Sequence, residues 1–222
     1  MVAAERSVQR WETCGEAWIA MLRHVWSAGE AGLEDQGPII EGPPVLFEIA
    51  SLSWEDPLLR EHGDRGLLVR EAHERTRGAA RPGPGPRPRG AHGADRLRWV
   101  IDLLRARPWT TSAWIPFAAA PPSDAEPRAA AGDPPDLVPR VVALSFRIRG
   151  YRLIMTAMFR SQDVIRCYLS YIPLRDVQVE VAEELGLPPG PLRIFIDVPH
   201  VRVADADHVA GILAAVPEHN AA

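Results

Sequence analysis

The chain is predicted to adopt an α+β fold in which helices cover a β-sheet, and two observations support this class. Segments with the hydrophobic period of a helix are interspersed with segments of strand character, without the regular alternation of an α/β protein. The length of 222 residues and the hydrophobic fraction of 46% suit one sizeable core. We therefore expect a single domain over residues 1–222.

Helical periodicity marks four segments of the chain. In the first, Trp11, Trp18 and Leu22 recur at the spacing of one helix face. In the third, Pro173 is expected in the first turn, where its missing N–H is tolerated, and Gly186 follows the last apolar residue as a stop. The four predicted helices span residues 5–28, 95–105, 173–185 and 207–216.

Strand character marks five further segments, which are apolar or alternate between apolar and polar residues. Every second residue from Val142 to Ile148 is apolar, and Ser145, Arg147 and Arg149 alternate with this set, so the apolar set is expected to face the core. The five predicted strands span residues 43–54, 110–117, 141–149, 152–160 and 192–196.

Two segments rich in Pro, Gly and Ala are expected to be flexible loops, residues 76–93 and 118–137. Their prolines and glycines would break a helix or a central strand. The first loop also carries several arginines, which either clamp phosphate groups or are simply solvated. The sequence leaves both roles of these arginines open.

Composition excludes several classes of partner and compartment. A net charge of −4 and an isoelectric point near 6.0 argue against a nucleic-acid-binding surface. No apolar run approaches the length of a membrane span, and the charged N-terminus does not resemble a signal peptide. Cys14 and Cys167 lie far apart and fit no metal-binding spacing, so we expect no metal site and a reduced, cytoplasmic protein.

A longer pattern spans Pro139 to His200. It contains the tetrad Arg-Ser-Gln-Asp at residues 160–163, then Val164, and later a helix that ends in Gly-Leu-Pro-Pro-Gly at residues 186–190. In order and spacing this pattern resembles the C-terminal half of the thymidylate synthase and pyrimidine hydroxymethylase superfamily, whose Arg-Ser-x-Asp-Val signature the tetrad matches.

The resemblance implies a thymidylate synthase-like fold, in which a large mixed β-sheet packs against its twin to form a homodimer. It also implies two active sites, each binding a pyrimidine nucleotide beside 5,10-methylenetetrahydrofolate. In the family a cysteine thiolate adds to carbon 6 of the pyrimidine, because carbon 5 alone is a poor nucleophile. The implied activity is therefore a folate-dependent one-carbon transfer.

Four residues match functional positions of the family. The resemblance assigns Arg160 and Ser161 to phosphate binding, through charge-assisted hydrogen bonds. It assigns His200 to the ribose and Asp163 to the folate cofactor. These four residues are the matched part of the predicted site.

Other family positions are occupied by different residues. The tyrosine that follows the histidine by two places is Arg202, and the asparagine that reads the pyrimidine edge is Tyr171. The catalytic cysteine is replaced by Arg140, which either binds an anionic group of the substrate or forms a salt bridge. Because arginine stays protonated and carries no nucleophilic lone pair, we expect no thymidylate synthase activity.

The remaining catalytic candidates each carry a structural alternative. Cys167 is either a substitute nucleophile or a buried, inert thiol. Asp163 either removes the proton of the acceptor, besides contacting the folate, or accepts an N–H at the turn after its strand. Tyr171 and Tyr168 are the alternative proton acceptors.

Two functions from different classes follow. In the first, the chain is a one-carbon transferase that passes a methyl or hydroxymethyl group to a small-molecule acceptor of specialised metabolism. An electron-rich aromatic or enol-like carbon would accept that unit without thiol activation. In the second, the chain is a non-catalytic relative that serves as a binding or scaffold module.

Overall fold

The computed structural model describes residues 8–34, 36–64, 66, 91–117 and 141–216 of the chain. Arg140, the predicted loop 118–137 and most of the predicted loop 76–93 lie outside these residues. The last three residues of the latter loop, 91–93, instead begin a helix.

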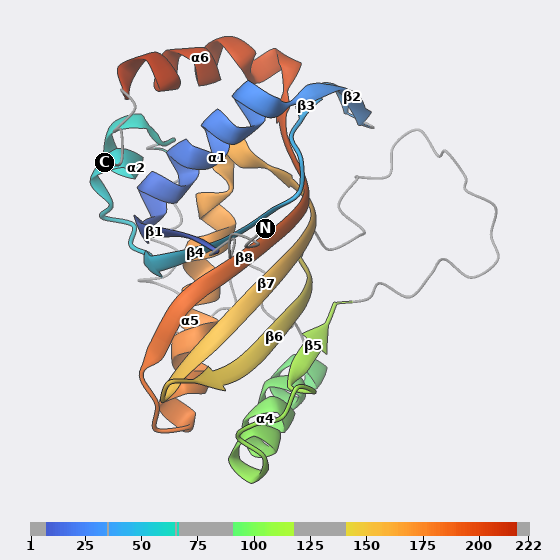
Figure 1. Ribbon diagram of the computed structural model, residues 1–222, viewed down its shortest axis with the longest axis vertical. Helices are drawn as coiled ribbons and strands as arrows, with labels where there is room; N and C mark the ends of the chain where they lie inside the picture. Colours follow the sequence, from blue (N-terminus) through green and yellow to red (C-terminus); the bar gives the residue numbers. More distant parts are fainter. Residues whose placement is uncertain (1–7, 35, 65, 67–90, 118–140, 217–222) are drawn as a thin grey trace, which may run out of the picture.

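The centre of the fold is a mixed eight-stranded sheet, which confirms the α+β class (Figure 1). Its main path runs β1-β4-β8-β7-β6-β5, and the β2–β3 hairpin adds to β8 through β3. The β1/β4 and β7/β8 pairs are parallel and the other pairs antiparallel. The strands are β1 Gln9–Thr13, β2 Glu30–Glu34, β3 Gly37–Glu41, β4 Val45–Ser51, β5 Trp114–Pro116, β6 Val141–Arg149, β7 Arg152–Asp163 and β8 Pro189–Arg202.

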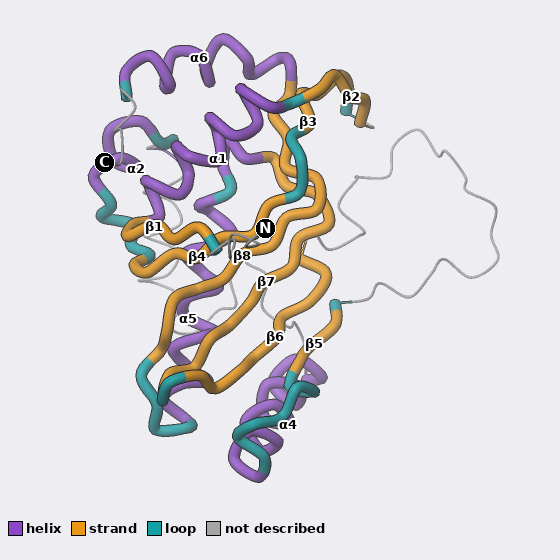
Figure 2. The backbone as a smooth tube through the Cα atoms, viewed as in Figure 1, coloured by secondary structure: helices purple, strands orange, loops and turns teal. Residues whose placement is uncertain are grey.

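Two long helices, α1 and α5, contact each other and pack against the sheet, as the tube drawing shows (Figure 2). The chain between β7 and β8 consists of the short 3-10 helix η2 and then α5. No described helix is long and apolar enough to cross a membrane. The helices are α1 Cys14–Ala28, α2 Pro57–His62, α4 Ala91–Ala106, η2 Val164–Arg166, α5 Tyr168–Glu184, η3 Val203–Asp205 and α6 Ala206–Ala215.

The predicted helix over residues 5–28 is shorter in the structure, because residues 9–13 form β1. Thr13 caps α1: its side chain accepts the Glu16 N–H, and the Glu16 carboxylate accepts the Thr13 N–H. This reciprocal capping box fixes the helix start at Cys14. Trp11 therefore lies on a strand, and its apparent helical spacing was misleading.

Three details of the predicted elements are also corrected. Helix α5 begins at Tyr168, so Pro173 lies inside the helix, where it removes one backbone hydrogen bond. The predicted strand 110–117 is reduced to Trp114–Pro116. Val142 is 37% exposed rather than buried, because a register shift between Val141 and Ala143 interrupts the alternation of β6.

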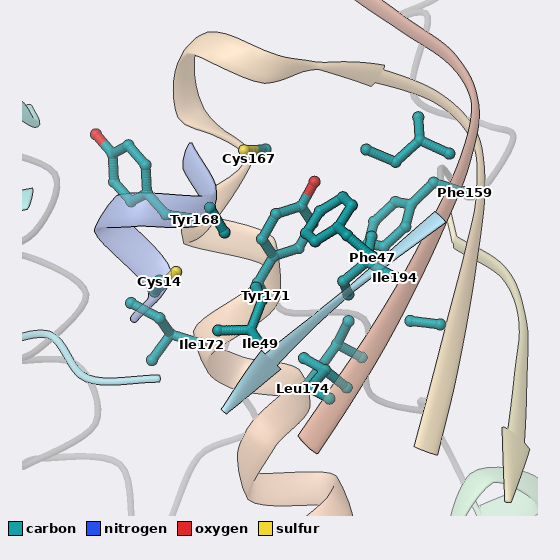
Figure 3. Packing of buried hydrophobic residues seen from close by; sticks show 14 of the residues in the cluster. Cys14, Phe47, Ile49, Phe159, Cys167, Tyr168, Tyr171, Ile172, Leu174 and Ile194 are labelled. Carbon is teal, nitrogen blue, oxygen red and sulfur yellow. The ribbon is translucent and has the colours of Figure 1, made fainter. Parts of the chain in front are cut away.

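The core lies between α1, α5 and the sheet, and Tyr171 is one of its largest buried side chains (Figure 3). Its ring meets Phe47 and Phe159 edge to face, with centroids 6.2 and 5.6 Å apart. Such T-shaped pairs stabilise a core beyond the area that they bury.

One buried polar side chain connects α5 to the parallel strand pair. Gln178 is fully buried, and its amide donates to the Leu153 carbonyl at 2.8 Å and the Gly190 carbonyl at 3.2 Å. Its own oxygen accepts from Arg175. The side chain thus satisfies backbone carbonyls at the start of β7 and of β8.

Replacing Gln178 by Met keeps the side-chain length but removes the amide donor. We expect Gln178→Met to lower the free energy of unfolding by about 2 kcal/mol, because the Leu153 carbonyl loses this donor and Arg175 loses the Gln178 oxygen as an acceptor. Glu180→Met, at an exposed position of the same helix, should change it by less than about 0.5 kcal/mol. Urea unfolding measures both, and equal effects of the two changes would contradict this role of Gln178.

Candidate functional site

The parallel pairing of β7 with β8 brings Ser161 and Asp163 of the tetrad beside His200. In register, Ser161 pairs with Val198 and Asp163 pairs with His200, at the carboxyl ends of both strands. Paired residues of neighbouring strands project to the same face, and alternate residues share that face. Ser161, Asp163 and His200 therefore share one face, the face that also carries the buried Phe159.

His200 is the centre of a short chain of polar contacts. Its side chain is 4% exposed, and its Nδ1 lies 3.3 Å from Ser161 Oγ and 3.3 Å from the Val198 carbonyl. Its Nε2 lies 3.5 Å from the carboxylate of Glu34. Both ring nitrogens therefore face polar groups within the protein.

Glu34 is the residue that sequence reasoning missed. It ends β2, and β3 of the same hairpin pairs with β8, which places the hairpin beside His200. The local pattern of the hairpin carries no signal for this contact. Only the pairing of β3 with β8 brings the carboxylate to the histidine.

Asp163 both caps a turn and contacts a cation. One carboxylate oxygen accepts the Ile165 N–H at 3.1 Å, and the other lies 3.8 Å from Arg202 Nε. The turn-capping role that the sequence left open is therefore present. The carboxylate retains lone pairs for a ligand, because an ionised carboxylate accepts about four hydrogen bonds. The predicted contact with folate stays a prediction.

Two buried polar atoms beside this cluster have no hydrogen-bond partner in the described part of the chain. They are Arg202 Nε, whose only contact is the long ion pair with Asp163, and Gln162 Oε1. Buried polar atoms are nearly always satisfied, and exceptions concentrate where a ligand or water completes the structure. Arg202 shares the face of His200 and Asp163 at the strand ends, whereas strand alternation places Gln162 on the opposite face, with Arg160.

The structure does not bring Arg160 together with these residues. Arg160 is exposed, and strand alternation turns it to the face opposite Ser161. Arg140 lies outside the described residues, so its two predicted roles stay open.

Cys167 and Tyr171 are both fully buried in the hydrophobic core. Figure 3 shows them among the packed apolar side chains. Burial raises the pKa of the Cys167 thiol from 9.0 to about 12, so the thiol is protonated at neutral pH. Burial also raises the pKa of Tyr171 well above 10.0. The Tyr171 hydroxyl has no regular hydrogen bond, although the Cys167 thiol is close enough to affect its pKa. In this conformation neither group reaches a substrate.

Tyr168, the other candidate base, is also held by the protein. Its hydroxyl accepts the Asp64 N–H at 2.9 Å, and burial raises its pKa to about 12. It borders a small polar cavity of about 40 Å³, which is room for one or two water molecules. The cavity is lined by Trp18, His62, Asp64, Ile165, Arg166, Tyr168, Asp205 and His208.

Comparison with known proteins shows a similarity that extends over nearly the whole chain. No protein-family model matches the chain. The chain is similar to a protein of Methanosarcina mazei described as "Putative thymidylate synthase", with 25% identity over 220 residues. The match covers 92% of this chain and 93% of that protein, so the similarity extends over nearly the whole of both.

The buried thiols and tyrosines predict a loss of stability in alkaline solution. Cys14, Cys167 and Tyr171 all have pKa values raised by burial, so the unfolded chain loses these protons first as pH rises. The contribution of the Cys167 thiol to stability is complete below pH 9 and falls between pH 9 and about 12. For Cys14 and Tyr171 the loss likewise begins as pH rises through their ordinary pKa values. In that range each group lowers the free energy of unfolding by about 1.4 kcal/mol per pH unit.

Cys167→Ala should make the free energy of unfolding fall less steeply with pH above pH 9, by about 1.4 kcal/mol per pH unit, which is the contribution of one group. Urea unfolding at intervals from pH 7 to 10.5 measures it, and the slopes of the variant and the native chain should agree between pH 7 and 8. Identical slopes above pH 9 would show that the Cys167 thiol already ionises in the folded protein.

Proposed function

We propose that this protein is a thymidylate synthase-like one-carbon transferase that uses 5,10-methylenetetrahydrofolate and a small-molecule acceptor other than a pyrimidine monophosphate. The similarity to the Methanosarcina protein over nearly the full length of both chains supports the relationship. The position of Ser161, Asp163 and His200 on one face at the ends of two adjacent strands supports a shared site.

The observation that carries the proposal is the burial of both thiols. Cys14 and Cys167 are 0% exposed, and they are the only cysteines of the chain. Without an accessible thiolate, carbon 5 of a pyrimidine cannot be activated by covalent addition. The acceptor must therefore be nucleophilic by itself, as an electron-rich aromatic ring or an enol is.

The residues around Asp163 fit the pterin end of a folate. Asp163 accepts hydrogen bonds, and a pterin edge presents N–H donors. The orphaned Arg202 Nε–H, on the face of His200, is a donor for a ring nitrogen or carbonyl. When bound, the cofactor would supply the one-carbon unit.

Ser161, His200 and Asp163 would hold and deprotonate the acceptor. Ser161 and His200 orient its polar end, and Asp163 removes the proton from its reacting carbon, because Tyr168 and Tyr171 are buried. The Asp163 side chain is 12% exposed, so a bound ligand can reach it.

Isothermal titration calorimetry with a stable folate, such as tetrahydrofolate, tests cofactor binding. We expect micromolar affinity for the native chain and about tenfold weaker binding by Asp163→Asn, since a hydrogen bond to a charged group is lost. Asp197→Asn, at an exposed position of β8, is the matched control and should bind like the native chain. Thermal melting of both variants separates binding loss from unfolding.

The result of this titration also separates the two functional classes. Absence of folate binding by the folded native chain would contradict the transferase and favour the non-catalytic scaffold. Where folate binds, isotope-labelled methylenetetrahydrofolate incubated with a metabolite extract should yield a labelled methyl or hydroxymethyl product.

We also propose a homodimer formed through the outer face of the sheet. On one face of the sheet α5 packs against β7 and β8, and α4 packs against β5 and β6; the described residues place no helix on the other face (Figure 1). Large apolar side chains are partly exposed on the sheet, including Leu46 at 41% and Trp114 at 49%. Strand alternation places Leu46 opposite the buried Phe47.

Leu46→Arg should convert this dimer into a monomer, because a charge buried in an apolar interface is unpaired. Light scattering coupled to size-exclusion chromatography measures the mass. Leu33→Arg, at a position of β2 that is 83% exposed, should leave the dimer intact. A monomeric native chain, or a dimer that survives Leu46→Arg, would contradict the proposed interface.

A further inference from the structure

We propose that the turn between β6 and β7 inserts into a groove on a second copy of this chain, so that copies associate head to tail. The turn is a basic tip formed by residues 149–152. The groove is acidic and lies between the end of α1 and the β2–β3 hairpin. This inference is independent of the proposed transferase function and of the outer-face dimer, because the residues that carry those proposals belong to neither surface.

Tyr151 is the central side chain of the basic tip. It is 87% exposed and has a φ of 60°, next to Gly150 with a φ of 55°. A two-residue hairpin turn with two positive φ values suits glycine or asparagine, whereas a tyrosine there costs about 1 kcal/mol of strain. Tyr151 therefore neither favours the turn nor fills the core. An exposed tyrosine beside arginines is the composition of an interface anchor.

Arg149 and Arg152 flank the tyrosine and carry charge that the described part of the chain does not balance. They pair directly across the two strands, where like charges repel each other. Both are exposed, and neither forms an ion pair with a described residue. The Arg149 guanidinium donates only locally, to the Ile148 carbonyl at 3.1 Å. An acidic partner would offset the charge of both arginines.

The acidic groove has the opposite charge. Glu30 and Glu41 line it and pair directly across the β2–β3 hairpin, so they also repel each other. Neither glutamate has an ion-pair partner among the residues that the structure describes. The groove also lies at the C-terminus of α1, whose last turn holds no basic residue, so the helix dipole adds partial negative charge.

The groove has room for an aromatic side chain. Its volume is about 360 Å³, within the range of roughly 300–1,000 Å³ in which organic groups bind. Beside the two glutamates it presents apolar surface from four small or rigid residues, Ala28, Ala31, Pro43 and Pro44. An aromatic ring between two guanidiniums therefore matches the groove in shape and in charge.

Contact between the tip and the groove would relieve both repulsions together. Each arginine of the tip would meet a carboxylate, and such pairs form strong, often bidentate hydrogen bonds. Water alone leaves both like-charged pairs in place. A second copy of the chain is therefore the partner that this charge complementarity favours.

The tip and the groove of one copy cannot meet, because they lie at opposite ends of the sheet (Figure 1). Strand β3 pairs with the end of β8, and His200 there pairs with Asp163 at the end of β7, whereas Arg152 begins β7. At the rise of a strand, the 12 residues of β7 separate the two surfaces by about 35 Å. Such a heterologous contact leaves a free tip and a free groove on the outer copies, so assembly continues beyond two copies.

Sedimentation velocity of the full chain over a range of concentrations measures this association. We expect the mass of the native chain to rise with concentration beyond two copies at low salt. The mass should fall at high salt, because the Debye length shortens from about 10 Å at 0.1 M to about 3 Å at 1 M.

Two charge reversals test the contact from both sides. Arg152→Glu at the tip and Glu30→Arg in the groove should each weaken association at least about tenfold, because like charges then meet. An equimolar mixture of the two variants should restore association, since the intact tip of one variant meets the intact groove of the other. Arg107→Glu, at an exposed position after α4, is the matched control and should associate like the native chain.

Tyr151→Gly separates the role of the ring from folding, because glycine adopts a positive φ without strain. It should weaken association about tenfold without lowering the melting temperature. Two results would overturn the inference: a native chain whose mass stays at or below two copies at low salt, or a mixture of the charge variants that associates no better than either alone. A native chain of constant mass whose tip binds poly-glutamate would assign the tip to another acidic partner, which also contradicts the proposed contact.

Discussion

The parallel pairing of β7 with β8 is the constraint on which the candidate site depends. Both strands also pair antiparallel with other neighbours, and the connection between them runs through η2 and α5. Parallel strands end at the same edge of a sheet, so the tetrad at the end of β7 meets His200 near the end of β8. Gln178 supports this arrangement from α5, by hydrogen bonds to the starts of both strands.

The connection through η2 and α5 also separates the polar residues at the strand ends from the apolar core. Asp163 caps η2, and the chain then enters α5 at its N-cap residue Cys167. Cys167, Tyr171, Leu174 and Gln178 recur at helical spacing and are all buried. A thiol four residues after Asp163 is therefore directed into the core and away from the strand ends. The chemistry available at the strand ends is that of a serine, a histidine, carboxylates and a guanidinium.

Much of the fold was predictable, because local pattern determines it. The strand pair β6–β7, the stripe of α5 and the stop at Gly186, whose φ is +67°, follow from alternation, helical period and glycine chemistry. The start of α1 was missed, because tryptophan spacing outweighed the Thr13–Glu16 capping box. Helical spacing from Cys167 to Tyr171 and Leu174 also predicts that these residues share one buried face. We instead considered Cys167 and Tyr171 as catalytic candidates.

The contact of Glu34 with His200 could not be predicted in this way. It depends on β3 pairing with β8, and long-range pairing leaves no mark in the local sequence of a hairpin. The resemblance assigned both Arg160 and Ser161 to phosphate binding. Strand alternation, however, places these two side chains on opposite faces of the sheet. Resemblance thus located the neighbourhood of the site, and tertiary pairing decided which side chains share it.

The central claim is that this fold works without a nucleophilic thiol, and its most direct test is an assay for thymidylate. Purified protein is incubated with dUMP and labelled 5,10-methylenetetrahydrofolate, and the nucleotide products are resolved by mass spectrometry. No labelled thymidylate, and no covalent dUMP adduct on Cys14 or Cys167, is the predicted result. Labelled thymidylate, or an adduct on either cysteine, would contradict it.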